Sequence, residues 1–150
     1  MKNEMTLTFS ALSENESFAR NAVAAFCAVL DPTVDQINDI KTAVSEAVTN
    51  VIVHAYAEAS EDNIVTVKTS IDGGTVHIVV SDNGIGIDDI EHAMQPFYTT
   101  KPEQERSGMG FTVMESFTDE LTVKHNEPCG TVVSMTKTIR GGADWKRKRR

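Results

Sequence analysis

Glu46, Asn50 and His54 recur at every fourth position of the otherwise apolar stretch EAVTNVIVHAY, residues 46 to 56. Four residues of an α-helix turn the chain about 40° beyond one full turn, so these side chains would form a narrow strip beside the apolar stripe. An unpaired buried amide or carboxylate is costly, so such a strip should face a polar cavity, a metal or a ligand. A solvated helix face is the alternative, and the spacing alone would favour it.

The segment SDNGIGID, residues 81 to 88, could recognise a nucleotide base. An apolar strand carries Asp82 to its end, and Gly84 and Gly86 then allow a sharp turn and a close approach of the backbone to a bound group. An ionised carboxylate only accepts hydrogen bonds, which suits the exocyclic amine of adenine. On its own, the pattern is equally consistent with a simple turn that Asp82 opens.

A glycine-lined loop precedes an expected helix in TTKPEQERSGMGF, residues 99 to 111. Ser107, Gly108 and Gly110 would present backbone N–H groups at the N-terminus of that helix, which is a favourable place for a phosphate. Lys101 and Arg106 could add positive charge, although a surface loop with two cations is the commoner meaning of such a segment. The pattern Gly-x-x-x-x-Gly-Lys is absent, which excludes a P-loop nucleotidase.

The elements that must hold these motifs alternate along the chain. Residues 5–11 alternate between apolar and polar and predict a strand, after which Ser13 and Glu16 match a capping box that would start a helix. The turn DPT stops this helix. Thr33 and Gln36 match a second capping box, which predicts a longer helix that runs to about residue 56.

The second half of the chain predicts further strands and short helices. A hairpin signal, DGG, joins two expected strands, and a short helix is expected from Asp88. The expected strands span 64–71, 75–82, 121–125 and 131–139, with an irregular stretch at 95–106 and a helix at 110–117. This order predicts an α+β fold: a two-layer sandwich with a mixed, mostly antiparallel sheet and helices on one face. We expect one domain, residues 1–140, and a flexible basic tail, residues 141–150.

Composition and charge narrow the class of protein. The chain has 150 residues, 40% of them hydrophobic, and no apolar run of the roughly 20 residues that cross a bilayer, so we expect a cytoplasmic protein without a membrane partner. Its net charge of -8, despite the basic end KRKRR, argues against a direct nucleic-acid partner. Cys27 and Cys129 lack metal-ligand spacing and predict reduced, structural thiols.

In this order, the motifs resemble the nucleotide-binding domain of the gyrase, Hsp90, histidine kinase and MutL superfamily, whose histidine kinase-like ATPase fold is also called the Bergerat fold. The resemblance covers residues 5–140 and implies bound ATP or ADP with Mg²⁺. Sensor histidine kinases usually carry a second asparagine where His54 stands, so we assign His54 no catalytic role. The matching positions are Glu46-x-x-x-Asn50 with His54, Asp82-x-Gly84-x-Gly86, Gly108-x-Gly110 and Gly130-Thr131.

Longer segments resemble the family of anti-sigma-F factors of spore-forming bacteria, which are serine kinases. These segments are FSALSENESFAR, LDPTVDQINDIKTAVSEAVTN, QPFYTTKPE and ERSGMGFTVME. The resemblance implies a homodimer that binds a sporulation sigma factor (sigma F), holds it away from RNA polymerase, and uses ATP to phosphorylate a serine of an anti-anti-sigma factor. The alternative is a nucleotide-gated sigma-binding module of the same fold, without significant kinase turnover.

The resemblance also implies roles for single residues. Asn50 would ligate Mg²⁺, Glu46 would be the general base for the serine hydroxyl, and Asp82 would accept a hydrogen bond from the adenine amine. Arg20 would dock partner proteins. A lid formed by residues 95–107 would make the choice of partner protein depend on whether ATP or ADP is bound. The remaining nucleotide-binding positions are Gly84, Gly86, Thr99, Thr100, Lys101, Arg106, Ser107, Gly108, Met109, Gly110 and Thr131.

Overall fold

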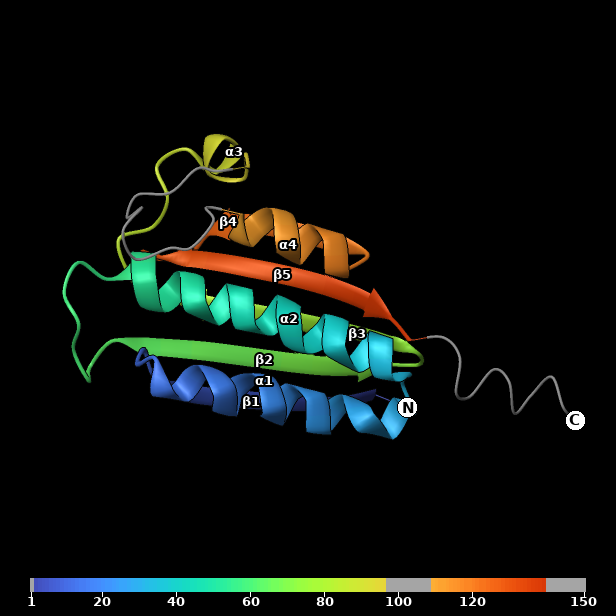
Figure 1. The fold of residues 1–150 in the computed structure, drawn as a ribbon. Coiled ribbons are helices and arrows are strands. Elements are labelled where there is room, and N and C mark those ends of the chain that lie inside the picture. Colours follow the sequence, from blue (N-terminus) through green and yellow to red (C-terminus); the bar gives the residue numbers. More distant parts are fainter. Residues whose placement is uncertain (1, 97–108, 140–150) are drawn as a thin grey trace, which may run out of the picture.

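The chain folds into one sheet with helices packed against one of its faces (Figure 1). The computed structural model describes residues 2–96 and 109–139. The strands are β1 (Lys2–Ser10), β2 (Ile64–Asp72), β3 (Thr75–Asp82), β4 (Glu120–His125) and β5 (Thr131–Thr138). The helices are α1 (Glu14–Cys27), α2 (Val34–Asn50), α3 (Ile90–Ala93) and α4 (Gly110–Phe117), with a 3-10 turn, Ala28–Leu30, after α1 and a π-helical turn, Val51–Ala55, after α2. The predicted α+β sandwich is confirmed.

The five strands lie in the order β1-β2-β3-β5-β4, and all four pairings between them are antiparallel. The sheet therefore differs in one detail from the prediction, since the described strands contain no parallel pair and the expected sheet was mixed. The connection from β3 through α3 and α4 places β4 at the outer edge. Strand β5 then returns between β3 and β4 and runs antiparallel to both.

Capping explains where α2 begins but not where α1 begins. Thr33 Oγ1 accepts from the Gln36 backbone N–H at 3.1 Å, and Gln36 Oε1 accepts from the Thr33 backbone N–H at 2.9 Å, which is the predicted capping box. The predicted box at Ser13 is wrong: the Ser13 backbone is already helical, and its side chain makes no cap hydrogen bond. Helix α3 begins at Ile90, with Asp89 as its N-cap, two residues later than the predicted start at Asp88.

The core lies between α2 and the inner face of the sheet. One row of apolar side chains crosses all five strands on this face, formed by Leu7, Val67, Val80, Val133 and Val123. Helix α2 contributes the buried residues Ile40, Ala43, Val44, Ala47 and Val48. Because side chains alternate along a strand, Asp82 shares the inner face with Val80 and lies at the end of β3, beside the core.

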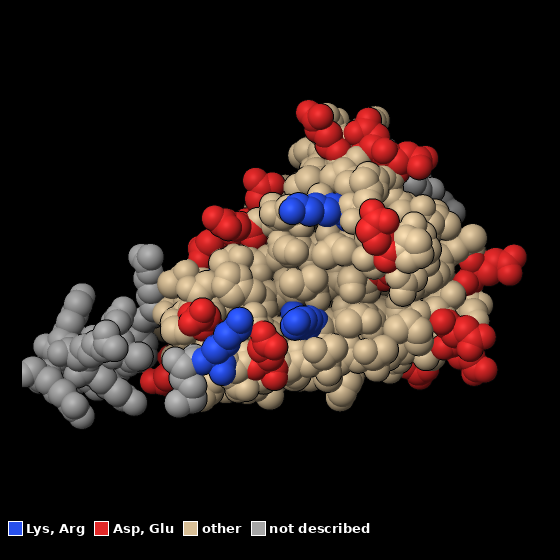
Figure 2. All heavy atoms as spheres, turned by 180° about the vertical axis from the view of Figure 1, so that it is seen from behind, with Lys and Arg blue, Asp and Glu red and all other residues tan. Residues whose placement is uncertain are grey.

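No helix of the described residues covers the other face of the sheet. Figure 2 shows the molecule from this side, where acidic side chains stand mainly along the margins and the centre carries few charges. The open face is instead rich in hydroxyl-bearing and other polar residues, among them Thr6, Thr66 and Ser134. The acidic margins agree with the low isoelectric point of the sequence, about 4.9.

The two cysteines differ in their surroundings. Cys27 is buried in the core, and this burial raises the pKa of its thiol to about 11. Cys129 is exposed in the turn between β4 and β5, and neither cysteine forms a disulfide. Among the described helices, none combines the length and the apolar character that crossing a lipid bilayer requires.

Thr69 supplies a test of the core. Its side chain is fully buried on the inner face of β2, and its hydroxyl has no hydrogen-bond partner. Thr69→Val removes this unsatisfied group and keeps the branched shape, so we expect the free energy of unfolding to rise by about 1 kcal/mol in urea titrations. Thr66→Val, on the open face of the same strand, is the matched control. A loss of stability in the Thr69 variant would contradict the assignment of an unpaired hydroxyl.

Candidate functional site

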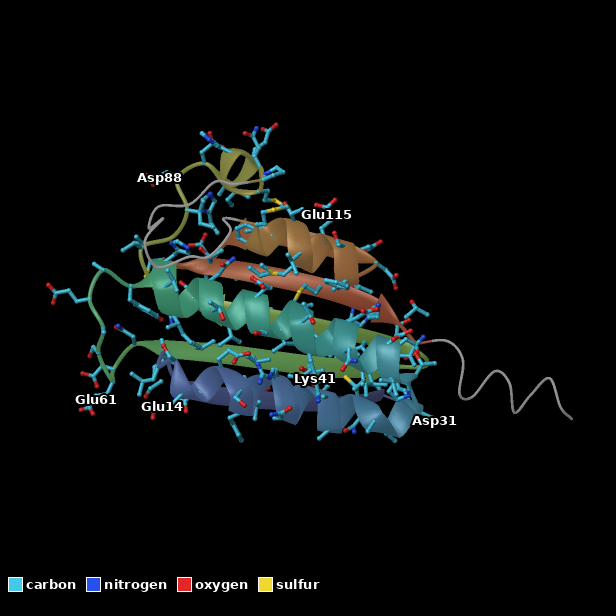
Figure 3. All side chains as sticks on the ribbon, in the orientation of Figure 1. Glu14, Asp31, Lys41, Glu61, Asp88 and Glu115 are labelled. Atoms are coloured by element: carbon cyan, nitrogen blue, oxygen red, sulfur yellow. The ribbon has the colours of Figure 1, made fainter. Side chains whose placement is uncertain are left out.

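A cavity of about 490 Å³ opens where the C-terminal end of α2 meets the ends of β3 and β5 and the start of α4. The structure brings five of the predicted residues to its wall, namely Asn50, Asp82, Gly86, Gly110 and Thr131. His54 lines the same cavity, together with apolar residues that the motifs do not contain, including Ala47, Ile85, Ala93 and Phe111. In Figure 3, Asp88, which also lines the cavity, marks its position above the end of α2.

A change of helix type positions two of the cavity residues. Asn50 is the last residue of α2, and the π-helical turn Val51–Ala55 follows directly. His54 lies within this turn, and both Asn50 and His54 line the cavity. Two members of the predicted polar strip therefore line this cavity, whereas the third, Glu46, does not.

Gly110 packs directly against the Asn50 side chain. A Cβ atom at position 110 would stand 2.9 Å from Asn50 Oδ1 and 3.1 Å from Nδ2, which is closer than side chains normally approach. Glycine at the first position of α4 thus lets the helix N-terminus, with its free backbone N–H groups, come close to the carboxamide. Donors for an anion and an oxygen ligand for a cation lie side by side at this point of the cavity.

Asp82 is a nearly buried carboxylate, with 5% of its surface exposed. Its Oδ1 accepts a hydrogen bond from the Gly84 backbone N–H at 2.9 Å. Burial raises the pKa of Asp82 above the ordinary value, while backbone hydrogen bonds from Gly84 and Thr131 act in the opposite direction. A buried acceptor on the wall of a cavity suits a ligand that donates a hydrogen bond, such as an amino group.

The loop after β3 is fixed from the side of α2. The Ile85 backbone N–H donates to the Ala55 carbonyl at 2.7 Å, and a Cβ at Gly84 would overlap that same carbonyl group. Tyr56 adds a second link, because its hydroxyl accepts from the Asn83 N–H at 3.2 Å and donates to the Ile64 carbonyl at 2.6 Å. Gly84 is therefore required for close approach, whereas Gly86 is required for its left-handed backbone, at φ +76°.

The turn between β4 and β5 fixes the same loop from the other side. Asn126 Nδ2 donates to the Asp82 carbonyl at 2.8 Å, and the Cys129 thiol lies 3.3 Å from the Asn83 carbonyl. Gly130 has a φ of +98°, and a Cβ there would overlap the Asp82 carbonyl. Sequence reasoning missed Tyr56 and Asn126, since no spacing relates them to the motifs.

Glu46 faces a different hollow. It does not line the large cavity but a second one of about 280 Å³, together with Arg20, Asn38, Lys41, Thr42 and Ser45. Figure 3 shows the labelled Lys41 where α1 and α2 face each other. Arg20 Nη1 donates to both carboxylate oxygens of Glu16 at 3.1 Å, one turn earlier on α1. The structure thus brings Glu46 and Arg20 to one polar hollow, separate from the cavity that Asn50 lines.

Most of the predicted lid, residues 95–107, lies outside the described part of the chain. The same is true of six predicted nucleotide-binding residues: Thr99, Thr100, Lys101, Arg106, Ser107 and Gly108. Met109 directly precedes α4. Among the described residues, no cluster of three or more His, Cys, Asp and Glu side chains could hold a metal ion. A metal in this cavity would have to rely on Asn50 and on the ligand itself for most of its coordination.

Asp82 leads to a pH-dependent prediction. Its folded-state pKa is raised, so its contribution to stability is fully present below the ordinary carboxyl pKa of about 3.9 and is lost as the pH rises through the raised value. Asp82→Asn keeps an oxygen for the Gly84 N–H but does not titrate. The stability of this variant relative to the original protein should therefore increase with pH across that window.

Denaturant unfolding at a series of pH values measures this difference, and Asp62→Asn in the exposed α2–β2 connection controls for the loss of one carboxylate. A stability difference that falls with rising pH would contradict the burial of a raised-pKa group at position 82.

The chain matches a known protein family and solved structures of the same fold. The model of the histidine kinase-like ATPase domain family matches residues 9–137. The crystal structure of the RsbU and RsbW domains of Rv1364c from Mycobacterium tuberculosis has the same fold, with a TM-score of 0.65 and 20% sequence identity. The match covers 91% of this chain and 32% of that one, so the chain spans about a third of the length of that structure.

Full-length relatives are much closer in sequence. The anti-sigma F factor of Geobacillus kaustophilus (strain HTA426) is 58% identical over 139 residues, which cover 93% of this chain and 94% of the relative. The anti-sigma F factor of Bacillus velezensis (strain DSM 23117 / BGSC 10A6 / LMG 26770 / FZB42) is 55% identical with the same coverage. This chain therefore belongs to the histidine kinase-like ATPase family and, within it, to the anti-sigma F factors.

Proposed function

We propose that this protein binds ATP in the 490 Å³ cavity, phosphorylates a serine of an anti-anti-sigma factor, and binds and inhibits a sporulation sigma factor of the sigma F type. The observation that carries the proposal is the convergence of Asp82 and Asn50 on one cavity wall in a chain 58% identical to a protein named anti-sigma F factor. Such a protein acts where RNA polymerase does, in the cytoplasm. Residues 1–140 would form its functional domain, with 141–150 as a basic appendage.

The shape and chemistry of the cavity suit a nucleotide. Its volume falls in the range of roughly 300 to 1,000 Å³ that is usual for sites of small ligands. The buried Asp82 carboxylate can accept from the adenine amine, and apolar residues such as Ile85 and Phe111 can cover the faces of the base. At the other end, Gly110 brings the N-terminus of α4 to the place where phosphates would lie.

The residues present fit Mg²⁺ held with the nucleotide. Mg²⁺ prefers oxygen ligands and keeps several waters, so one carboxamide oxygen, that of Asn50, is enough from the protein when phosphates supply others. The lack of an acidic cluster among the described residues is consistent with this arrangement. When bound, Mg²⁺ would neutralise the charge of the phosphates. Asn50, held by its contact with Gly110, would orient them.

Glu46 would take the proton from the serine hydroxyl as the hydroxyl oxygen attacks the terminal phosphorus of ATP and ADP leaves. Its place one helical turn before Asn50 puts it beside the phosphate end of the cavity rather than within it. A base at this point is open to a hydroxyl that arrives from the hollow between α1 and α2. The acceptor protein would then dock over that hollow, where Arg20 lies.

A nucleotide-gated sigma-binding module without kinase turnover is the second candidate. The position of Glu46 outside the nucleotide cavity favours it, since a base must reach the reacting hydroxyl. In either case, if residues 95–107 form a lid that responds to the terminal phosphate, the choice of partner protein would depend on whether ATP or ADP is bound. We also propose a homodimer as the form that binds the sigma factor.

One substitution tests the nucleotide site that both candidates share, and a second separates the candidates. Asn50→Ala should weaken binding of Mg-ATP at least about tenfold, because it removes the metal ligand.

Glu46→Gln should leave that affinity within about twofold but lower phosphorylation of the anti-anti-sigma factor at least about a hundredfold, with sigma binding retained. Calorimetry, labelled phosphate transfer and pull-down measure the three quantities. Glu61→Gln, in the connection between α2 and β2, is the control for loss of a carboxylate. Undiminished phosphorylation in the Glu46 variant would exclude Glu46 as the base.

Arg20 gives an independent test of partner docking. Arg20→Glu should weaken pull-down of both the sigma factor and the anti-anti-sigma factor by at least about tenfold while ATP affinity stays unchanged, because Arg20 lies outside the nucleotide cavity. Lys68→Glu, on the open face of the sheet, is the control for charge reversal. Equal binding of both partners by the Arg20 variant would remove this residue from the docking surface.

A further inference from the structure

We propose that Asn126 is a positioning residue for adenine recognition, acting through Asp82. The inference rests on the proposed nucleotide site and concerns what gives that site its preference for one base. Asn126 lies in the turn between β4 and β5, 44 positions along the chain from Asp82, and it is not part of the motifs that mark the cavity. It does not line the cavity itself.

The Asn126 side chain is fixed at both of its polar atoms. Its Nδ2 donates to the Asp82 carbonyl at 2.8 Å and lies 3.4 Å from Asn83 Oδ1. Its Oδ1 accepts from the Glu127 backbone N–H at 2.9 Å, and its own backbone N–H donates to the Gly130 carbonyl at 3.0 Å. The turn thus holds the carboxamide rigidly, and the carboxamide in turn holds the end of β3.

The direction of the Asp82 carboxylate depends on this backbone. One carboxylate oxygen already accepts from the Gly84 N–H, so the group can face the cavity correctly only when residues 82 and 84 keep their relative positions. From the α2 side, Ala55 holds Ile85 and Tyr56 holds Asn83. The side chain of Asn126 supplies a hydrogen bond to the Asp82 carbonyl from the opposite side, so its loss leaves only weaker or more distant contacts there, those of Cys129 and Thr131, to fix the strand end.

A shift of the carboxylate should change base preference more than nucleotide binding as a whole. Adenine presents an amino group where guanine presents a carbonyl oxygen. A fixed carboxylate attracts the first and repels the second, so discrimination needs the acceptor in one place, whereas the phosphates bind elsewhere in the cavity. The ratio of ADP to GDP affinity is therefore the quantity that Asn126 controls.

The experiment compares Asn126→Ala, Asn126→Asp and the unchanged protein by calorimetry with ADP and GDP. Asn126→Asp keeps an oxygen for the Glu127 N–H but replaces the donor to the Asp82 carbonyl with an acceptor. We expect the ADP:GDP affinity ratio to fall about fivefold or more in both variants. Asn15→Ala is the matched control, since it removes a similar side-chain bond, from Asn15 Nδ2 to the Ser10 carbonyl at 2.9 Å, and neither residue lines the cavity.

Other outcomes overturn the inference. A folded Asn126 variant that loses affinity for ADP and GDP equally, or keeps the original ratio, has a structural role only. Circular dichroism identifies any variant that does not fold, and Asn126→Asp then decides the question if Asn126→Ala unfolds. If the unchanged protein itself binds ADP and GDP equally, the proposed adenine site fails, and the role of Asn126 fails with it. A clear preference that Asn126→Asp leaves intact overturns only the role of Asn126.

Discussion

The hydrogen bond from the Ile85 N–H to the Ala55 carbonyl joins the end of the helical layer to the end of the sheet, and the cavity depends on it. It forms only because Gly84 has no side chain where that carbonyl stands. Helix α2 and its π-turn carry Asn50 and His54, whereas β3 carries Asp82, so this contact, together with the Tyr56 link and the shared core, fixes the two sets of groups relative to each other. The same contact closes the space between the two layers on one side of the cavity.

A second constraint is electrostatic. A nearly buried carboxylate is expensive, and among the described residues the cost is partly offset by backbone N–H groups from Gly84 and Thr131 rather than by a cation. A neutralising lysine or arginine beside Asp82 would stabilise the protein but would compete with a ligand for the acceptor. The site therefore retains an acceptor that a bound amino group can satisfy, which is the kind of local disadvantage that functional sites commonly carry.

Much of this arrangement could be predicted from the sequence, because its main signals are local. Alternation marked the strands, the Thr33 capping box marked the start of α2, and the order of the motifs placed Asn50, Asp82 and Gly110 in one site. What failed depends on contacts between distant segments. Ser13 matched a capping-box pattern, but the backbone of Ser13 is already helical. The return of β5 between β3 and β4 made the described sheet wholly antiparallel. Asn126 is brought to Asp82 only by the folding of the chain.

The π-helical turn after Asn50 has a consequence for how the sequence of this helix can vary. It places one additional residue between the packed body of α2 and the strand-like backbone at Tyr56, so the two sides of the turn follow different periodicities. Ala47, Val51 and Ala55 belong to the hydrophobic core and also line the cavity, so substitutions on either side of the start of the turn act on both. Deleting one residue from Val51–Ala55 would displace the Ala55 carbonyl that accepts from the Ile85 N–H, so the helix end, the imidazole of His54 and the loop after β3 would all shift together.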